Sequence, residues 1–169
     1  MRNKPSRNIT MTQLSAGSLD RYDRSILQIL QREGRLTNSE LADRVNLSES
    51  ACLRRVRSLE ASGLIEGYTA LLNQQKAGLG VNVFVSITLE RQERADMAAF
   101  EQAVRTVPEV MECYLMTGEY DYLLRVVVAD TADFERLHSR HLTSLPHVSR
   151  LHSSFALRTV QKSRELPVR

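Results

Sequence analysis

Residues 110–129 read VMECYLMTGEYDYLLRVVVA, and their pattern is the clearest indication of the architecture of the chain. Two runs rich in β-branched and aromatic residues flank a short polar connection, Gly118-Glu119-Tyr120-Asp121. Such a pattern is typical of two antiparallel strands joined by a hairpin. We therefore expect strands at 110–117 and 122–129, and the rest of the domain follows from what lies on either side of them.

Helical and strand periodicities alternate on both sides of this hairpin. Before it, residues 81–89 place an apolar side chain at every odd position, and 94–107 have the helical period. After it, a helical segment ends at Pro146, and 148–160 form a last strand. The order β-α-β-β-α-β over 81–160 predicts a ferredoxin-like domain within an α+β chain. Helices then cover one sheet face and leave the other to water, a ligand or another subunit.

Residues 19–67 have a different period and predict three short helices. Thr37-Asn38-Ser39-Glu40 is a capping-box sequence, in which the Thr37 and Glu40 side chains each satisfy a backbone amide of the other residue. Asn46-Leu47 is a tight turn, and Ser48 caps the third helix. Two capped helices across a short turn fit a helix-turn-helix, whose recognition helix enters the major groove of DNA.

The outward side of the third helix carries the candidate DNA contacts. Cys52 begins an apolar stripe at i, i+4 and i+7 that points inward, so the opposite side is polar and rich in arginine. We expect the first residues to approach base edges, Arg54 to bind guanine or phosphate, and Arg55 and Arg57 to contact phosphate. Backbone amides at the start of the second helix suit a phosphate. The candidates are Thr37, Asn38, Ser39, Ser48, Glu49, Ser50, Arg54, Arg55 and Arg57. A plain three-helix bundle with a solvated arginine face also fits this pattern.

The segment TGEYDY at 117–122 holds more special residues than a hairpin turn requires. Gly118 permits a positive φ or a close approach of the backbone, and Asp121 offers a carboxylate at the mouth of the sheet. Such a loop suits a small zwitterion, with its carboxylate on backbone amides, its ammonium on Asp121 and its side chain against Leu115. An ordinary turn, in which the aspartate caps its own backbone, explains the same residues.

Composition excludes several classes of protein. The chain has 169 residues, 42% hydrophobic and 25% charged, which argues against wholesale disorder. No apolar run approaches the roughly 20 residues that span a bilayer, no secretory apolar region is present, and two cysteines make no disulfide framework. A cytoplasmic location is therefore expected. The net charge of +3 lies in residues 1–18, which we expect to form a disordered basic tail, so DNA binding must depend on local charge placement.

Catalytic and metal-binding motifs make no positive case. His138 and His141 stand at i, i+3, but no cysteine or carboxylate ligands complete a tetrahedral metal site. Cys113 lies within an expected strand and has no organised base beside it. Glycine-rich phosphate loops and hydrolase motifs are absent from the sequence. We expect no enzyme activity, no cofactor and no bound metal.

Four segments together resemble the Lrp/AsnC (feast/famine) family of transcription regulators, especially its leucine-responsive branch. They are LDRYDRSILQILQREGR (19–35), TNSELADRVNLS (37–48), ACLRRVRSLEASGLIEGYTALLN (51–73) and ECYLMTGEYDYLLRVVV (112–128). A helix-turn-helix alone is weak evidence of kinship. Its coupling to a βαββαβ domain that carries Gly-x-Tyr-Asp is highly specific for this family.

The resemblance implies a domain order and an assembly. It implies a winged-type helix-turn-helix at 19–67, a hinge strand at 68–80, an effector-binding and oligomerisation domain at 81–160, and a tail at 161–169. Members of the family form homodimers through the open sheet face and commonly assemble further, often to octamers on double-stranded DNA. They sense amino acids at interfaces between dimers. This chain is accordingly expected to be a nucleoid-associated transcription regulator.

The resemblance also assigns residues to the effector site. Gly118, Tyr120 and Asp121 match the effector loop, and 149–153 match a segment that reaches the effector from a neighbouring dimer. The effector-binding candidates are Leu115, Thr117, Gly118, Glu119, Tyr120, Asp121, Ser149, Leu151 and Ser153. Leu151 and His152 depart from the threonine-rich leucine-responsive branch, so leucine is the first expectation and another apolar or small amino acid remains open.

Two further readings of the chain as a whole stay open. One is an effector-independent, nucleoid-type architectural protein, which would bind DNA with little dependence on its sequence. The other is an allosteric amino-acid-binding subunit of an enzyme, in which the helical part serves only for docking. The first predicts no response to amino acids, and the second predicts no affinity for DNA.

Overall fold

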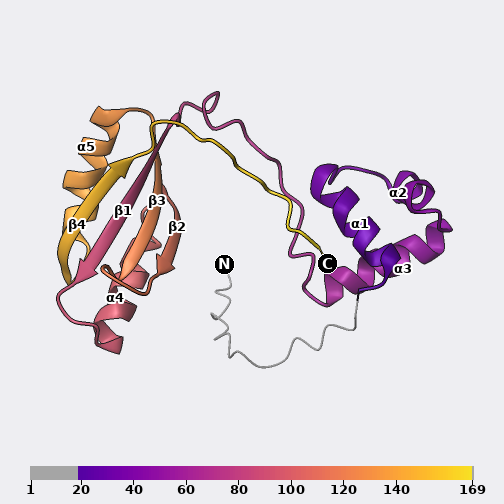
Figure 1. Cartoon of the computed structure of the whole chain (residues 1–169), viewed down its shortest axis with the longest axis horizontal. Coiled ribbons are helices and arrows are strands. Elements are labelled where there is room, and N and C mark those ends of the chain that lie inside the picture. The colour runs from indigo at the N-terminus through magenta and orange to yellow at the C-terminus, as the bar shows by residue number, and fades with distance from the viewer. Residues whose placement is uncertain (1–18, 169) are drawn as a thin grey trace. The chain divides into compact units, whose positions relative to one another are not determined.

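The computed structural model describes residues 19–168, which form two units (Figure 1). The first unit contains residues 19–69 together with 163–168, and the second contains 70–162. The expected basic tail at 1–18 lies outside the described residues. In the part of the chain that the structure describes, no helix combines the length and apolar character that crossing a membrane requires.

Three helices build the first unit. They are α1 (Arg21–Arg32), α2 (Asn38–Val45) and α3 (Glu49–Ala61). Asp20, Thr37 and Ser48 each accept a hydrogen bond from a backbone amide of the helix that follows, as their sequence context predicts. Asn46 adopts the left-handed conformation with φ 54°, which ends α2 and turns the chain toward α3. The helices enclose a small core of Ile26, Leu27, Leu41, Ala42, Val45, Cys52 and Leu59.

The second unit is the predicted βαββαβ domain. Its elements are β1 (Val81–Leu89), α4 (Arg94–Val104), β2 (Val110–Leu115), β3 (Tyr122–Val128), α5 (Thr131–Arg140), the 3-10 helix η1 (Leu142–Ser144) and β4 (Val148–Phe155). The strands lie in the order β2-β3-β1-β4, and every neighbouring pair is antiparallel. Figure 1 shows α4 and α5 behind one face of this sheet. The structure thus confirms the α+β, ferredoxin-like architecture.

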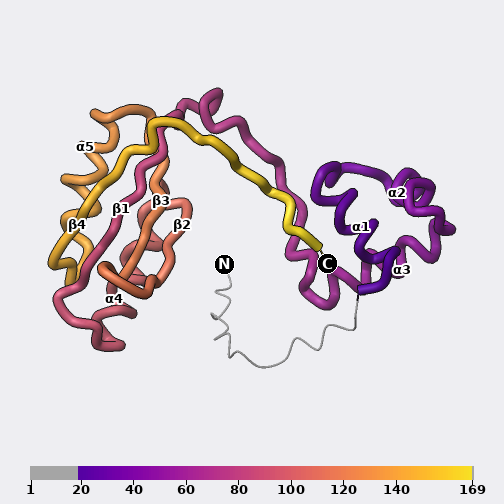
Figure 2. Tube along the Cα trace, in the orientation of Figure 1, coloured from indigo at the N-terminus to yellow at the C-terminus, as the bar shows by residue number. Residues whose placement is uncertain are grey.

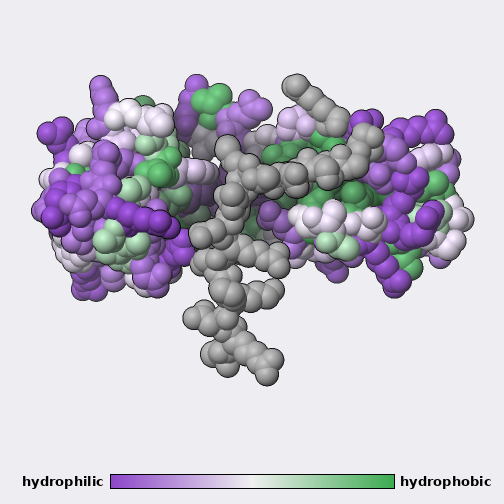
Figure 3. Space-filling view, turned by 90° about the horizontal axis from the view of Figure 1, so that it is seen from below, coloured by the Kyte–Doolittle hydropathy of each residue, from purple (hydrophilic) through white to green (hydrophobic). Residues whose placement is uncertain are grey.

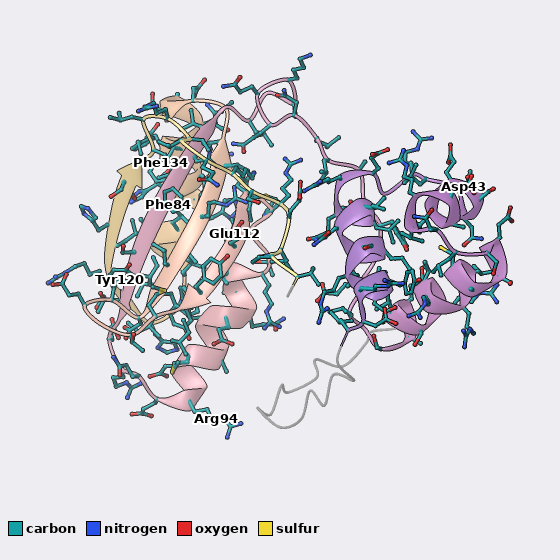
Figure 4. All side chains as sticks on the ribbon, turned by 45° about the vertical axis from the view of Figure 1, so that its right-hand side comes forward. Asp43, Phe84, Arg94, Glu112, Tyr120 and Phe134 are labelled. Carbon is teal, nitrogen blue, oxygen red and sulfur yellow. The ribbon has the colours of Figure 1, made fainter. Side chains whose placement is uncertain are left out.

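The two faces of the sheet differ in burial. Val83, Val85 and Ile87 of β1 are fully buried on the helix-covered side, where Phe100 of α4 packs with them. On the other face Phe84 is 38% exposed, and Figure 4 shows it on the uncovered side together with Glu112. The alternation arises because successive side chains of a strand point to opposite faces. One sheet face is therefore open in the single chain.

Several element boundaries differ from those that periodicity indicates. β2 ends at Leu115 because Met116 already donates its amide to the carbonyl of Asp121 and begins the loop. β4 ends at Phe155, well before residue 160. No strand is assigned to residues 68–80 in the described chain: residues 74–78 form turns, and Gln74 bonds to Leu79 through both backbone and side chain, so the hinge role of 68–80 stays a prediction. Backbone groups that close on their own segment are unavailable to a strand partner.

Hydrophilic residues cover most of the surface that is visible in Figure 3, and smaller hydrophobic patches lie between them. Large apolar side chains with more than half of their surface exposed include Leu71 and Leu72, which precede β1 in the second unit, and Met111 and Leu115 on the edge strand β2. Isolated exposed apolar residues are normal for a folded protein. Leu115 is singled out below because it also lines a cavity.

Candidate functional site

Of three arginines on helix α3, two are exposed to solvent and the third forms ion pairs with residues at the start of α1. Arg54 and Arg57 are exposed, and neither forms an ion pair with another described residue. Arg55 instead donates to Asp20 at 2.7 Å and to Asp23 at 2.9 Å. Its guanidinium also lies over the ring of Tyr22, 5.3 Å from the centroid. These ion pairs attach α3 to the start of α1, and the expected phosphate contact of Arg55 stays a prediction.

The Asp20 carboxylate at this junction is held in its charged form. The backbone amide of Asp23 lowers the pKa of Asp20, and Arg55 lowers it further. Hydrogen bonding to Asp23 and then to Asp20 raises the pKa of Arg55. Because both partners are stabilised as ions, the contact between α1 and α3 stays formed at neutral pH.

The first residues of α2 and α3 bind one another. The Ser39 hydroxyl donates to Glu49 Oε1 at 2.9 Å, and the Asn38 side chain donates to the Glu49 carbonyl at 2.9 Å. Thr37 and Glu40 form the reciprocal capping box, and the backbone amide of Thr37 lowers the pKa of Glu40. These contacts engage the Asn38, Ser39 and Glu49 side chains between the two helices, and the expected DNA contacts of these residues stay a prediction. The contacts within the protein fix the angle between the two helices.

The residues that remain available on this surface form a short set. Ser48 caps α3 at the Ala51 amide and lies 3.3 Å from the Ser50 hydroxyl, so both hydroxyls sit at the start of the helix. One turn further along, Arg54 lines a polar recess of 240 Å³ with Asp23 and Ser58. Hydroxyl groups at the N-terminus of a recognition helix can contact base edges, and exposed arginines further along it can contact bases or phosphates.

The second candidate site is a cavity of 410 Å³ in the second unit, which we call the loop cavity. It lies between the connection from β2 to β3 and the start of α4; Tyr120, labelled in Figure 4, belongs to its wall. Its lining residues are Gln92, Met97, Leu115, Met116, Thr117, Gly118, Tyr120 and Asp121. Gly118 has φ 126°, a conformation that side-chain-bearing residues rarely adopt, so glycine lets the loop close around the cavity.

Asp121 attaches this loop to the end of β1. Its carboxylate accepts from the Leu89 amide at 2.7 Å and from the Gln92 side chain at 2.6 Å, and only 9% of the residue is exposed. Its own amide donates to the carbonyl of Ile87 at 2.8 Å. The sequence suggested either an ammonium partner or an ordinary turn cap. The structure excludes the ordinary turn cap, because the carboxylate binds the Leu89 amide and the Gln92 side chain instead of the backbone of its own turn, and Asp121 lines the loop cavity.

Other expected effector residues lie elsewhere in this chain. Glu119 is exposed and does not line the loop cavity. On β4, Ser149 donates to the Thr88 carbonyl at 3.0 Å, and Leu151 packs against the core of its own unit. The Ser153 hydroxyl is buried without a hydrogen-bond partner among the described residues. A single chain therefore does not bring β4 to the cavity, and a role for it requires a neighbouring copy.

Sequence reasoning missed three residues of the cavity wall. Gln92 follows β1 in the polar run Arg91–Glu93, and nothing in that run marks it as a binding residue. Met97 has the spacing of a helix core residue, and Met116 lies in an expected strand. Only the sheet register, which brings the end of β1 beside β3, reveals that these side chains share one cavity.

Histidine and cysteine side chains form no metal site in residues 19–168, where no cluster of three His, Cys, Asp or Glu residues occurs. His138 packs against the ring of Phe134, with centroids 6.0 Å apart. Burial and the nearby Glu101 raise the pKa of the Cys113 thiol to about 11, so it is protonated at neutral pH.

Comparison with known proteins gives the same two-part division. The chain matches the sequence models of a winged helix-turn-helix DNA-binding domain at 19–66 and of the Lrp/AsnC ligand binding domain at 82–166. It is 42% identical over 151 residues to the leucine-responsive regulatory protein of Escherichia coli, covering 89% of this chain and 92% of that one.

Solved structures are similar over the same extent. A transcriptional regulator of Neisseria meningitidis in complex with L-methionine has 40% identity and a TM-score of 0.84, covering 88% of this chain and 96% of that chain. A feast or famine regulatory protein of M. tuberculosis, complexed with L-methionine, has 36% identity and a TM-score of 0.78, with 88% and 98% covered. The relatives named here are all regulatory proteins.

Proposed function

The chain belongs to the Lrp/AsnC family of DNA-binding transcription regulators with an amino-acid ligand-binding domain, and from that premise we propose which residues perform each task. The start and exposed side of α3 contact DNA. The loop cavity binds the amino acid. Binding there changes the assembly of the protein and, through it, the affinity for DNA.

The DNA contacts are assigned to Ser48, Ser50, Arg54 and Arg57. The two hydroxyls stand at the N-terminus of α3, where recognition helices approach base edges. The two arginines are exposed and unpaired within the described residues, so no ion pair has to break when they meet guanine or phosphate. In a dimer, the two α3 helices would contact half-sites about one helical turn apart, ~34 Å.

The effector assignment depends on one observation: a buried carboxylate and three apolar side chains line the same cavity. We assign the ammonium of the amino acid to the side where Asp121 and Gln92 meet, and its carboxylate to backbone amides around Gly118. Its side chain packs on Met97, Leu115 and Met116. Such a wall selects an apolar amino acid, with leucine as the first candidate and methionine next, since relatives carry L-methionine.

Assembly completes the proposed mechanism. The uncovered sheet face, which bears Phe84 and the Arg125–Glu112 ion pair, would form the dimer interface. Dimers would associate further, to an octamer, and bring Ser149, Leu151 and Ser153 of a neighbouring copy toward the effector. A ligand at such a junction favours one assembly over another, and a coupling of about 1–3 kcal/mol between the two sites suffices for regulation. We place this activity in the cytoplasm, at the nucleoid.

A thermal-shift screen of the purified protein against the twenty amino acids tests the effector assignment. Ligand at 100 times its Kd stabilises the native state by about 2.7 kcal/mol, which gives a measurable increase in Tm. Leu115→Glu should abolish the shift because it puts a charge into the cavity wall. The matched variant Leu157→Glu should keep the shift, since Leu157 is fully exposed and lies outside the cavity. A flat screen would contradict the effector assignment and favour an architectural DNA-binding role.

A further inference from the structure

An apolar groove on the first unit contacts a segment from far along the chain. Leu27 and Leu30 of α1, with Leu64, Ile65 and Tyr68 after α3, form one side of this groove, which we call the α1 groove. Residues 163–168 return to this unit, and Leu166 and Val168 line the other side. Val168 also packs against the helix core. The remaining space between them is 440 Å³.

The end of α1 binds the backbone of this segment directly. Gln31 Oε1 accepts from the Leu166 amide at 2.6 Å, and Gln31 Nε2 donates to the Leu166 carbonyl at 3.2 Å. One side-chain amide thus satisfies both backbone groups of one residue, as a neighbouring strand does when an extended peptide binds. The next residue, Arg32, pairs with Glu165 at 2.8 Å.

The segment itself is suited to bind as an extended peptide. Pro167 biases Leu166 toward extended backbone conformations and has no amide that would be left unpaired. Val168 then packs against the helix core, whereas Leu166 is 76% exposed and is held mainly through its backbone. Less conformational freedom is lost when a segment of this kind binds than when a flexible one does.

We propose that the α1 groove is a peptide-binding site and that its ligand is this chain's own segment 163–168. The helix-turn-helix unit would then be attached to the ligand-binding unit twice, through 70–80 and through 156–162. Both connections leave the sheet side by side, because the Ala156 amide donates to the Asn82 carbonyl at 3.0 Å; Figure 2 traces the paired strands from which they start. A seven-residue connector keeps the segment at an effective concentration on the order of millimolar, so a weak site stays occupied.

Hydrogen exchange of the Leu166 amide in the full chain tests the contact. Pro167 has no exchangeable amide, which simplifies the assignment of the signal. We expect exchange to be roughly fivefold slower in the unaltered protein than in Gln31→Ala, because the variant lacks the acceptor. Gln102→Ala, at an exposed glutamine of α4, is the matched control and should leave the rate unchanged. Equal rates in the unaltered protein and Gln31→Ala would overturn the proposal.

Binding in trans tests the groove independently. A chain that ends at Lys162 should bind a fluorescent peptide of residues 163–168, whereas the full chain should bind it at least tenfold more weakly because its groove is filled. A peptide with Val168→Glu should bind neither. Equal binding to both chains, or none to the shortened one, would contradict the site. If the slow exchange of Leu166 disappeared on dilution, a second copy would supply the segment and the own-chain assignment would be wrong.

Discussion

The two candidate sites are built in different ways. On the DNA-contacting side, all proposed contacts come from Ser48 and the helix that it caps, and the helical period alone determines which side chains point outward. The loop cavity combines the end of β1, the start of α4 and the connection from β2 to β3. A site that lies on one helix can therefore be predicted from the spacing of residues along the sequence, whereas a site between several elements depends on how those elements pair and pack.

Two adjacent arginines show where local spacing stops being sufficient. Arg54 and Arg55 are neighbours in sequence, and the helical period predicts that both contact DNA. Arg54 is exposed, but Arg55 meets Asp20 and Asp23 at the start of α1. The difference arises from the packing of α1 against α3, and the spacing of residues within α3 gives no information about that packing.

The largest effect is expected from removing an aromatic side chain from the core between α4 and the sheet. Phe100 is fully buried and stacks on Tyr122 with ring centroids 4.5 Å apart, so Phe100→Ala should destabilise the ligand-binding unit by about 3–5 kcal/mol. Phe155→Ala, at a residue that is 42% exposed, should have a much smaller effect. Hydrogen exchange should accelerate in the sheet and leave α1–α3 protected. Equal acceleration in both units would mean that they do not fold independently.

Arg54→Ala and Arg55→Ala should separate DNA contact from folding. We expect Arg54→Ala to weaken DNA binding by about 1–3 kcal/mol and to leave the Tm unchanged. Arg55→Ala should lower the Tm, because two carboxylates lose their partner. Electrophoretic titration at fixed salt, with Arg140→Ala as a control of equal charge outside this unit, measures the first effect. Weakened binding in Arg140→Ala by the same factor would show that only net charge matters.

Asp121→Asn should weaken the amino-acid complex while retaining most of the fold. The amide oxygen can still accept from Leu89, but the negative charge that faces the ammonium is lost, which should reduce affinity by about 1.4 kcal/mol, or tenfold. Isothermal titration with the amino acid found in the screen measures the change. Asp43→Asn makes the same change of charge at an exposed position of α2 and should have no effect. Unchanged affinity in Asp121→Asn would remove this carboxylate from the site.

The smallest effect concerns acid stability of the helical unit. Arg44 lowers the pKa of Glu33, and the Thr37 backbone amide lowers that of Glu40. A carboxylate whose pKa is lower in the folded state stabilises the folded state at every pH above its ordinary pKa of about 4.5. This stabilisation is lost as the pH falls through the pKa of the folded state. Glu33→Gln should therefore flatten the decrease in Tm between about pH 5 and pH 3. Identical profiles would show that the Glu33–Arg44 pair adds nothing.

Much of the fold could be predicted because its signals are local. The caps at Asp20, Thr37 and Ser48 lie within three residues of the amides that they bind, and the alternation in β1 identifies its buried face directly. The predicted element order and the antiparallel sheet are confirmed.

The contacts that could not be predicted join distant residues. Gln92 and Asp121 are 29 positions apart, and Gln31 and Leu166 are 135 apart. Glutamine is common on exposed helices and loops, so its type alone indicates no partner. Its role becomes visible only when the sheet register or the returning segment places a specific acceptor or backbone group beside it.

The most direct test of the whole account is DNA affinity measured with and without the amino acid that gives the largest thermal shift. The account predicts a change of roughly 5–150-fold at fixed salt, since the two sites are coupled by about 1–3 kcal/mol. In Asp121→Asn, DNA should bind as in the unaltered protein without amino acid, and the response should be shifted to about tenfold higher amino-acid concentration. An affinity for DNA that is the same with and without amino acid would show that the loop cavity does not regulate DNA binding.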